Sequence, residues 1–236
     1  GSIMATRARI GIKQKSGRII ASYQHWDGYP GGLGYNLCEN WENPKKVTDA
    51  IKLGDSSKWG VIIGEKHDFD ADRHGSDYEH MNCYYNRDRG EKDCGYKVYK
   101  DEAEYIENGF RSGEQYVYLM KDTGDKDYLG KPKFTWYYVE SRYTSEGKEV
   151  IDTEFKPLER YAILEHIDIM KRHLEMMDEF NNKVYSITKN YDLDDFNYSK
   201  DNIVKDKAKT WKTFNKLTIY TIVFVLIILV IIFNLF

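Results

Sequence analysis

The sequence is short of cysteine and proline, lacks a secretory signal and carries little net charge. Of its 236 residues only three are cysteines, Cys38, Cys83 and Cys94. An odd count fits no disulfide framework, which favours a reducing compartment. Lys and Arg total 35 against 38 Asp and Glu, for a net charge of −3. Without a basic field, duplex DNA is not an expected partner.

The common enzyme signatures are also missing. The sequence contains no phosphate-binding loop, GxGxxG, GxSxG, HExxH or paired CxxC motif. We therefore expect no nucleotide or metal cofactor from motif content alone. Aromatic residues make up 15% of the chain, with 20 tyrosines, and this content excludes a disordered polymer.

Long hydrophobic runs are absent from most of the chain and concentrated in residues 217–236. Every residue of LTIYTIVFVLIILVIIFNLF except Thr218, Thr221 and Asn234 is hydrophobic, and none is charged. A helix of this length spans about 30 Å, the thickness of a bilayer core. We therefore predict a transmembrane tail anchor at 217–236, preceded by a charged linker at 192–216.

The lysines of this linker set the expected orientation, because positively charged flanks stay in the cytosol. They are Lys200, Lys205, Lys207, Lys209, Lys212 and Lys216. We predict a single-pass membrane protein with its N-terminal body in the cytosol. Residues 1–3 precede Met4 and are expected to be an expression scar.

Residues 4–150 are predicted to form a soluble α+β domain with a small antiparallel sheet and a few short helices. Apolar and polar residues alternate in two pairs of segments, 5–13 with 18–23 and 115–120 with 134–140, and each pair predicts a β-hairpin.

Between these hairpins, glycine and proline mark a loop and a helix start. The segment 25–34 is rich in glycine and predicts a loop. Asn43 and Pro44 predict a helix that begins at these residues, because Asn caps helices and Pro suits their first position.

A long amphipathic helix is predicted at 157–191. Its apolar residues step by four and three, with one polar member, as in a coiled-coil seam. One interpretation is self-association through 163–184; the other is a helix that packs its stripe on its own domain. The seam residues are Ile163, Ile167, Met170, Leu174, Met177, Asn181 and Val184.

Five ordered motifs carry a resemblance to a known family. They are HWDGYP at 25–30, LGDSS at 53–57, GEKHDFD at 64–70, YNRDRGE at 85–91 and GEQYVY at 113–118. In this order and spacing, the chain resembles a family of small phage- and prophage-encoded proteins with an HWDGYP motif over about residues 5–140. The resemblance implies a viral accessory protein and supplies no mechanism.

The same motifs contain residues suited to a polar pocket. His25 with Asp27, or His67 with Asp70, is a candidate pair of base and orienting acid. Arg87 and Arg89 are able to hold a phosphate bidentately. A structural role for all of them, with the aromatics in the core and the charges in an ion network, is the competing interpretation. The candidate ligand-binding residues are Trp26, Tyr29, Arg87, Asp88, Arg89 and Glu91.

An acidic stretch offers a weak metal candidate. Asp68, Asp70, Asp72 and Glu79 occupy oxygen-ligand positions of a calcium loop, but Arg73 replaces its turn glycine. A transition-metal site from His67, His74, His80 and Cys83 is a second possibility, although the spacing matches no zinc signature. A hydrated acidic loop is the plainer interpretation.

We predict a phage-encoded, membrane-tethered accessory protein. It would bind a host protein or a small phosphorylated ligand at the cytosolic membrane face, in host takeover or counter-defence. One alternative is a hydrolase or phosphodiesterase that uses His25, Asp27, His67 and Asp70. Another is a structural component of a virion membrane.

Overall fold

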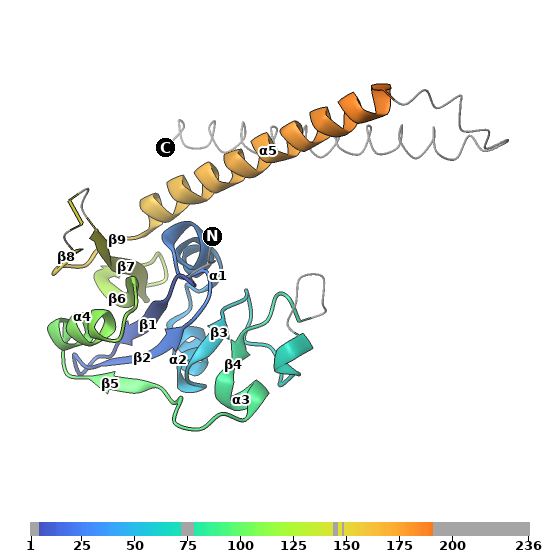
Figure 1. Ribbon diagram of the computed structural model, residues 1–236. Helices are drawn as coiled ribbons and strands as arrows, with labels where there is room; N and C mark the ends of the chain where they lie inside the picture. Colours follow the sequence, from blue (N-terminus) through green and yellow to red (C-terminus); the bar gives the residue numbers. More distant parts are fainter. Residues whose placement is uncertain (1–4, 72–77, 144–145, 148, 191–236) are drawn as a thin grey trace. The chain divides into compact units, whose positions relative to one another are not determined.

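The computed structural model in Figure 1 describes residues 5–71, 78–143, 146–147 and 149–190. The chain divides into two compact units, Gly1–Met176 and Met177–Phe236, and the first contains the whole sheet.

Among the described residues, the sheet has nine strands: seven follow the order β4-β3-β2-β1-β6-β7-β8, β5 pairs with β2, and β9 pairs with β7. The long strands are β1 (Ala8–Lys13), β2 (Ile19–Gln24), β6 (Tyr116–Lys126) and β7 (Pro132–Tyr143). The short strands are β3 (Ser56–Lys58), β4 (Cys83–Tyr84), β5 (Lys97–Tyr99), β8 (Glu149–Ile151) and β9 (Lys156–Pro157).

The helices before α5 are short, and α5 is long. They are the π-helix η1 (Pro30–Gly34), α1 (Tyr35–Asn40), α2 (Pro44–Lys52), the 3-10 helix η2 (Phe69–Ala71), α3 (Tyr85–Arg89), α4 (Glu102–Arg111) and the long α5 (Glu159–Asn190). The α+β class and the long helix are confirmed, and both predicted hairpins form as β1–β2 and β6–β7.

The prediction of a small antiparallel sheet is wrong, because the sheet is large and mixed. Strand β1 pairs in parallel with β6, from Ala8 opposite Tyr116 to Ile12 opposite Met120. Strand β2 also meets β3 in parallel, at Gln24 and Ser56. Hairpins are local and visible in sequence patterns, whereas the parallel join links segments about a hundred residues apart. The resulting central strand β1 is buried on both faces, as expected for parallel pairing.

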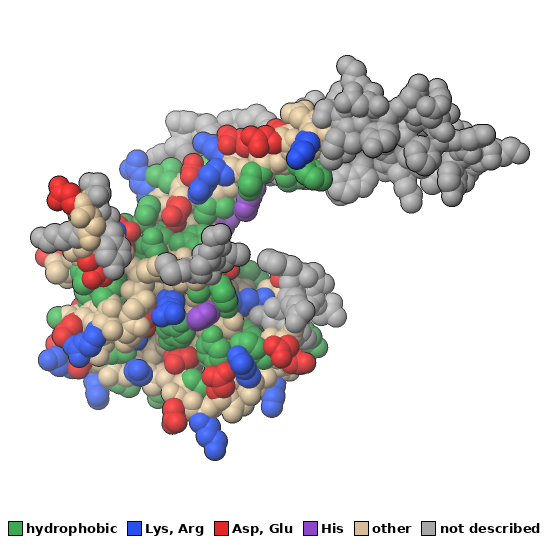
Figure 2. Space-filling view, in the orientation of Figure 1, with side chains coloured by type: hydrophobic (Ala, Val, Ile, Leu, Met, Phe, Trp, Pro, Cys, Tyr) green, Lys and Arg blue, Asp and Glu red, His purple; other side chains and the backbone are tan. Residues whose placement is uncertain are grey.

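Two hydrophobic cores lie on opposite faces of the sheet. One packs Ile10 and Tyr118 against α1, α2 and the start of α5. The other packs Ile19 and Val117 against α4. On the face drawn in Figure 2, basic and acidic side chains are interspersed over the body, with no broad field of one sign.

The predicted helix start at Asn43 is confirmed. The Asn43 side chain accepts hydrogen bonds from the backbone N–H groups of Lys45 and Lys46, and Pro44 is the first helical residue. The predicted loop at 25–34 is wrong in its second half, where Pro30–Gly34 forms η1. Proline at the first position suits a helix there in spite of the glycines.

Helix α5 begins inside the first core. Leu158 and Ala162 are fully buried there. Farther along, the seam residues Met170 and Met177 are 39% and 53% exposed. Self-association through 163–184 stays a prediction.

The predicted linker and anchor, residues 192–236, lie outside the described residues. Within the part of the chain that the structure describes, no helix is both long enough and apolar enough to cross a membrane.

Candidate functional site

The HWDGYP motif connects the end of β2 to η1, and its backbone is held on both sides. The N–H groups of His25 and Trp26 donate to the carbonyls of Ser56 and Ser57, which extends the β2–β3 pairing. Asp27 then adopts a left-handed conformation with φ of 56°. This is uncommon for a residue with a side chain, although Asp tolerates it better than most.

Gly28 is required by a close approach to the chain before β1. Its N–H donates to the carbonyl of Thr6, and its own carbonyl accepts from the Tyr118 hydroxyl at 2.8 Å. A Cβ at position 28 would lie 2.6 Å from the Thr6 oxygen. The backbone of the motif therefore serves the fold.

Gly31, just after the motif, forms the seat of α5. The Gly31 N–H donates to the Glu165 carboxylate, and the Gly31 carbonyl lies 2.8 Å from Nδ1 of His166. The His166 ring stacks on Tyr35 with centroids 3.8 Å apart. The segment after HWDGYP thus docks the long helix.

Unlike the backbone of the motif, which is held by the fold, three of its side chains line an open pocket of about 280 Å³. Trp26 is 42% exposed. Asp27 is exposed, and within the described residues its carboxylate makes no hydrogen bond or ion pair. Tyr29 lines this pocket and also a second one of about 590 Å³. The rest of the smaller pocket is Gln24, Gly32, Leu33, Asn36, Lys58, Trp59, Gly60, Val61, Glu79 and His80.

His25 is paired with a tyrosine that the sequence interpretation missed. Its Nδ1 lies 2.7 Å from the Tyr23 hydroxyl. Burial raises the pKa of Tyr23 to about 12, so this hydroxyl stays protonated beside the imidazole. Burial and the nearby Arg7 lower the pKa of His25, which favours the neutral imidazole. The predicted His25–Asp27 pair is therefore replaced by a Tyr23–His25 pair.

A signal for that pair was present in the sequence. Tyr23 and His25 are two residues apart at the end of β2, and such residues point to the same face of a strand.

His67 is buried in a separate cluster. Its ring stacks on Tyr78 with centroids 4.8 Å apart, and its Nδ1 lies 3.1 Å from the carbonyl oxygen of Glu65. Asp70 is exposed, and its backbone N–H donates to the Asp68 carboxylate. The predicted His67–Asp70 pair is therefore not formed. In the described part of the chain, no hydrogen bond or ion pair links the HWDGYP residues to His67.

Arg87 is a structural clamp and is not arranged as an open anion site. Its guanidinium donates to both oxygens of Asp88 and to the carbonyls of Ile63, Gly64 and Asn82. These contacts use all five of its N–H donors. The predicted bidentate phosphate contact would have to displace them.

Asp88 is the buried partner of this clamp. Burial alone would raise the pKa of Asp88, but hydrogen bonds from Arg87 and from the N–H groups of Tyr84 and His67 outweigh it, and the net pKa is lowered. Arg89 lies elsewhere, on the surface. It pairs with Glu91 at 3.3 Å and lies over the Phe69 ring.

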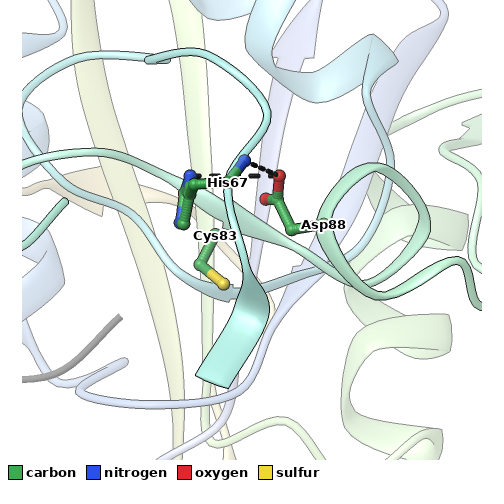
Figure 3. A group of neighbouring side chains, drawn as sticks. All are labelled: His67, Cys83 and Asp88. Atoms are coloured by element: carbon green, nitrogen blue, oxygen red, sulfur yellow. Dashed lines mark hydrogen bonds and ion pairs between the residues drawn. The ribbon is translucent and has the colours of Figure 1, made fainter. Parts of the chain in front are cut away.

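The predicted calcium loop falls partly outside the described residues, because Asp72 is among those not described. Asp68 and Asp70 are exposed, and Glu79 lines the smaller pocket. A different group with donors suited to a metal ion is found in the described part of the chain. His67, Cys83 and Asp88 place one donor atom each within 4.8 Å of one another. Figure 3 shows them as neighbours on a loop, β4 and α3, with the Asp88 carboxylate facing His67.

Comparison with known proteins finds no relatives. No family model matches the chain, and neither the curated proteins nor the solved structures contain a match. The resemblance to the phage family stays a prediction carried by the five motifs.

Proposed function

We propose that this chain is a phage accessory protein that binds a host protein at the cytosolic face of a membrane, through the pocket lined by Trp26, Asp27 and Tyr29. The observation that carries the proposal is that the backbone and the side chains of HWDGYP have different roles. The motif backbone is engaged by Thr6, Ser56, Ser57 and the Tyr118 hydroxyl. Its aromatic and acidic side chains line an open pocket.

The pocket chemistry favours a protein partner with a basic side chain. The half-exposed Trp26 ring and the exposed Asp27 carboxylate, which pairs with no cation among the described residues, together suit a guanidinium or ammonium group. A small phosphorylated ligand is less well supported, because the donors of Arg87 are all used and Arg89 pairs with Glu91.

The enzyme alternative has weaker support. Neither of the two predicted pairs of base and acid forms, since His25 bonds Tyr23 and His67 is buried away from Asp70. The proposed tether at 217–236 also suits a binder, because it concentrates the pocket at a surface and adds nothing to bond chemistry.

Photo-crosslinking in bacterial cells tests the proposal. A photoreactive residue replaces Trp26 in the full chain, and a control chain carries it at the exposed Lys15 in the β1–β2 turn. We expect one discrete adduct from position 26 and none from position 15. The adduct should be lost with Asp27→Asn, which removes the charge and still tolerates the left-handed conformation. Identical adducts from both positions, or an adduct insensitive to Asp27→Asn, would contradict the proposal.

A further inference from the structure

The proposed function uses the smaller pocket and gives no role to the larger one, of about 590 Å³. A volume of this size suits a small-molecule site. Two of the sequence motifs contribute to its wall, HWDGYP through Tyr29 and GEQYVY through Gln115 and Tyr116. All of its lining residues belong to the first compact unit. One face of α5 supplies Glu165, Ile169, Arg172, His173 and Met176.

The Glu165 carboxylate is the negative group of this pocket. Glu165 is half-buried, and one of its oxygens accepts from the Gly31 N–H, while the other has no partner among the described residues. Burial raises the pKa of Tyr29 and of Tyr116, and the negative charge of Glu165 raises both further. The carboxylate therefore lies near two protonated phenols. Such surroundings suit an ammonium group and disfavour an anion.

The Arg172 guanidinium is the positive group. It lies seven residues after Glu165 on the same face of α5, which is about 10 Å along the helix axis. The Arg172 side chain is 63% exposed and pairs at 3.3 Å with Asp168, which is 67% exposed. Because exposed ion pairs of this kind contribute little to stability, a ligand carboxylate is able to take the place of Asp168. A second cation is disfavoured here.

The rest of the wall offers an amide and an apolar side chain. The Gln115 side-chain oxygen accepts from the Arg7 N–H at 3.0 Å, and its NH₂ group has no partner in the described part of the chain. This NH₂ group is therefore able to donate to a carbonyl of a ligand. Ile169 follows Glu165 by one turn and precedes Arg172 by another, so it lies between the two charges on α5.

We propose that the larger pocket binds a short peptide with free termini, its ammonium group at Glu165 and its carboxylate at Arg172. One carboxylate and one guanidinium match a zwitterion better than a ligand with a single charge. An extended tripeptide spans about 10 Å, which matches the separation of the two charged residues along α5. A free amino acid is too short to reach both. A peptide also has the carbonyls that Gln115 is able to bind.

Calorimetric titration of the full chain in detergent with trialanine tests the proposal. We expect saturable binding of trialanine and weaker binding of free alanine. Acetylation of the peptide N-terminus, or amidation of its C-terminus, should each weaken binding on the order of tenfold or more, because each removes a charge-assisted contact. No binding of trialanine at millimolar concentration, or equal binding of the blocked and free peptides, would overturn the proposal.

A variant of α5 then locates the peptide carboxylate. Arg172→Gln should weaken the binding of trialanine by about the factor that amidation does, and should have no further effect on the amidated peptide. Lys171→Gln is the matched control, because it removes the same charge from an exposed neighbour outside the pocket, and it should leave the affinity unchanged. An equal loss for free and amidated peptide in Arg172→Gln would contradict the placement of the carboxylate. This comparison does not depend on a variant of Glu165, whose contact with Gly31 also holds α5.

Discussion

Gly31 is a position where the fold leaves no room for a side chain. A Cβ there would lie 2.9 Å from the carbonyl carbon of Glu165 and from the backbone nitrogen of His166. Backbone atoms inside a helix cannot move aside as a flexible side chain does. The added methyl group therefore has to displace α5 from its contact with Gly31. The same glycine supplies the N–H that meets the Glu165 carboxylate.

We therefore expect Gly31→Ala to lower the free energy of unfolding by about 1–3 kcal/mol, as overpacking does elsewhere. Gly95→Ala is the matched control, because nothing lies within 4 Å of its Cβ and its φ is not positive. Chemical denaturation of the full chain in detergent measures both. Equal effects at the two positions would show that α5 does not depend on this contact.

Single residues of the site were only partly predictable from the sequence. Trp26 and Tyr29, predicted to bind a ligand, and Asp27, predicted to orient His25, line one pocket, and their roles there stay predictions. The structural role of Arg87 was one of two interpretations of the sequence. The motif alone could not decide between them, because the carbonyls of Ile63 and Gly64 that Arg87 binds are 24 and 23 residues away in the chain. A motif shows which residues are present, while the tertiary fold decides which of their donors remain open.

At the scale of elements, α3 and the loops beside it depend on the Arg87 clamp. A guanidinium fork reaches Asp88, Asn82 and Ile63 at once, which a lysine ammonium is unable to do. With lysine at position 87, Asp88 would be buried with one hydrogen-bond partner fewer. Leaving a buried charge without its partners lowers the stability of the fold.

Arg87→Lys should destabilise the chain by about 2–4 kcal/mol. Arg89→Lys is the matched control on the same helix, and its 55% exposed side chain predicts a change near zero. Thermal and chemical unfolding measure the difference. If Arg87→Lys kept full stability and lost only affinity for inorganic phosphate, the earlier interpretation of Arg87 as a phosphate ligand would be restored.

The elements themselves were predictable where their signals are local. Alternation marked the β1–β2 and β6–β7 hairpins, and the Asn43 cap marked α2. The parallel join of β1 to β6 and the two-residue strand β4 were not predictable. Their pairing depends on contacts across the chain, and a two-residue strand is too short to show a period.

At the scale of the whole molecule, the pocket and the helix α5 are coupled through one segment. Residues 25–30 supply pocket side chains, and Gly31 seats α5 at Glu165 and His166. The chain that continues from α5 leads to the predicted anchor. A tether there would keep the pocket near a membrane surface, which is what the proposed binding role needs.

The membrane anchor is the last prediction, and it rests on sequence alone. The full chain should sediment with membranes and resist extraction by alkaline carbonate, because transfer of residues 217–236 out of lipid is strongly unfavourable. A chain that ends at Lys216 should be found in the supernatant and keep the crosslink from position 26 only at reduced yield, since the tether no longer concentrates it.

The sequence Asn197-Tyr198-Ser199 reports the orientation. In a microsomal translation system it should stay unmodified, because the lysine-rich flank keeps it in the cytosol. Glycan addition at Asn197 would contradict the predicted cytosolic orientation. Extraction of the full chain by alkaline carbonate would contradict the predicted membrane anchor.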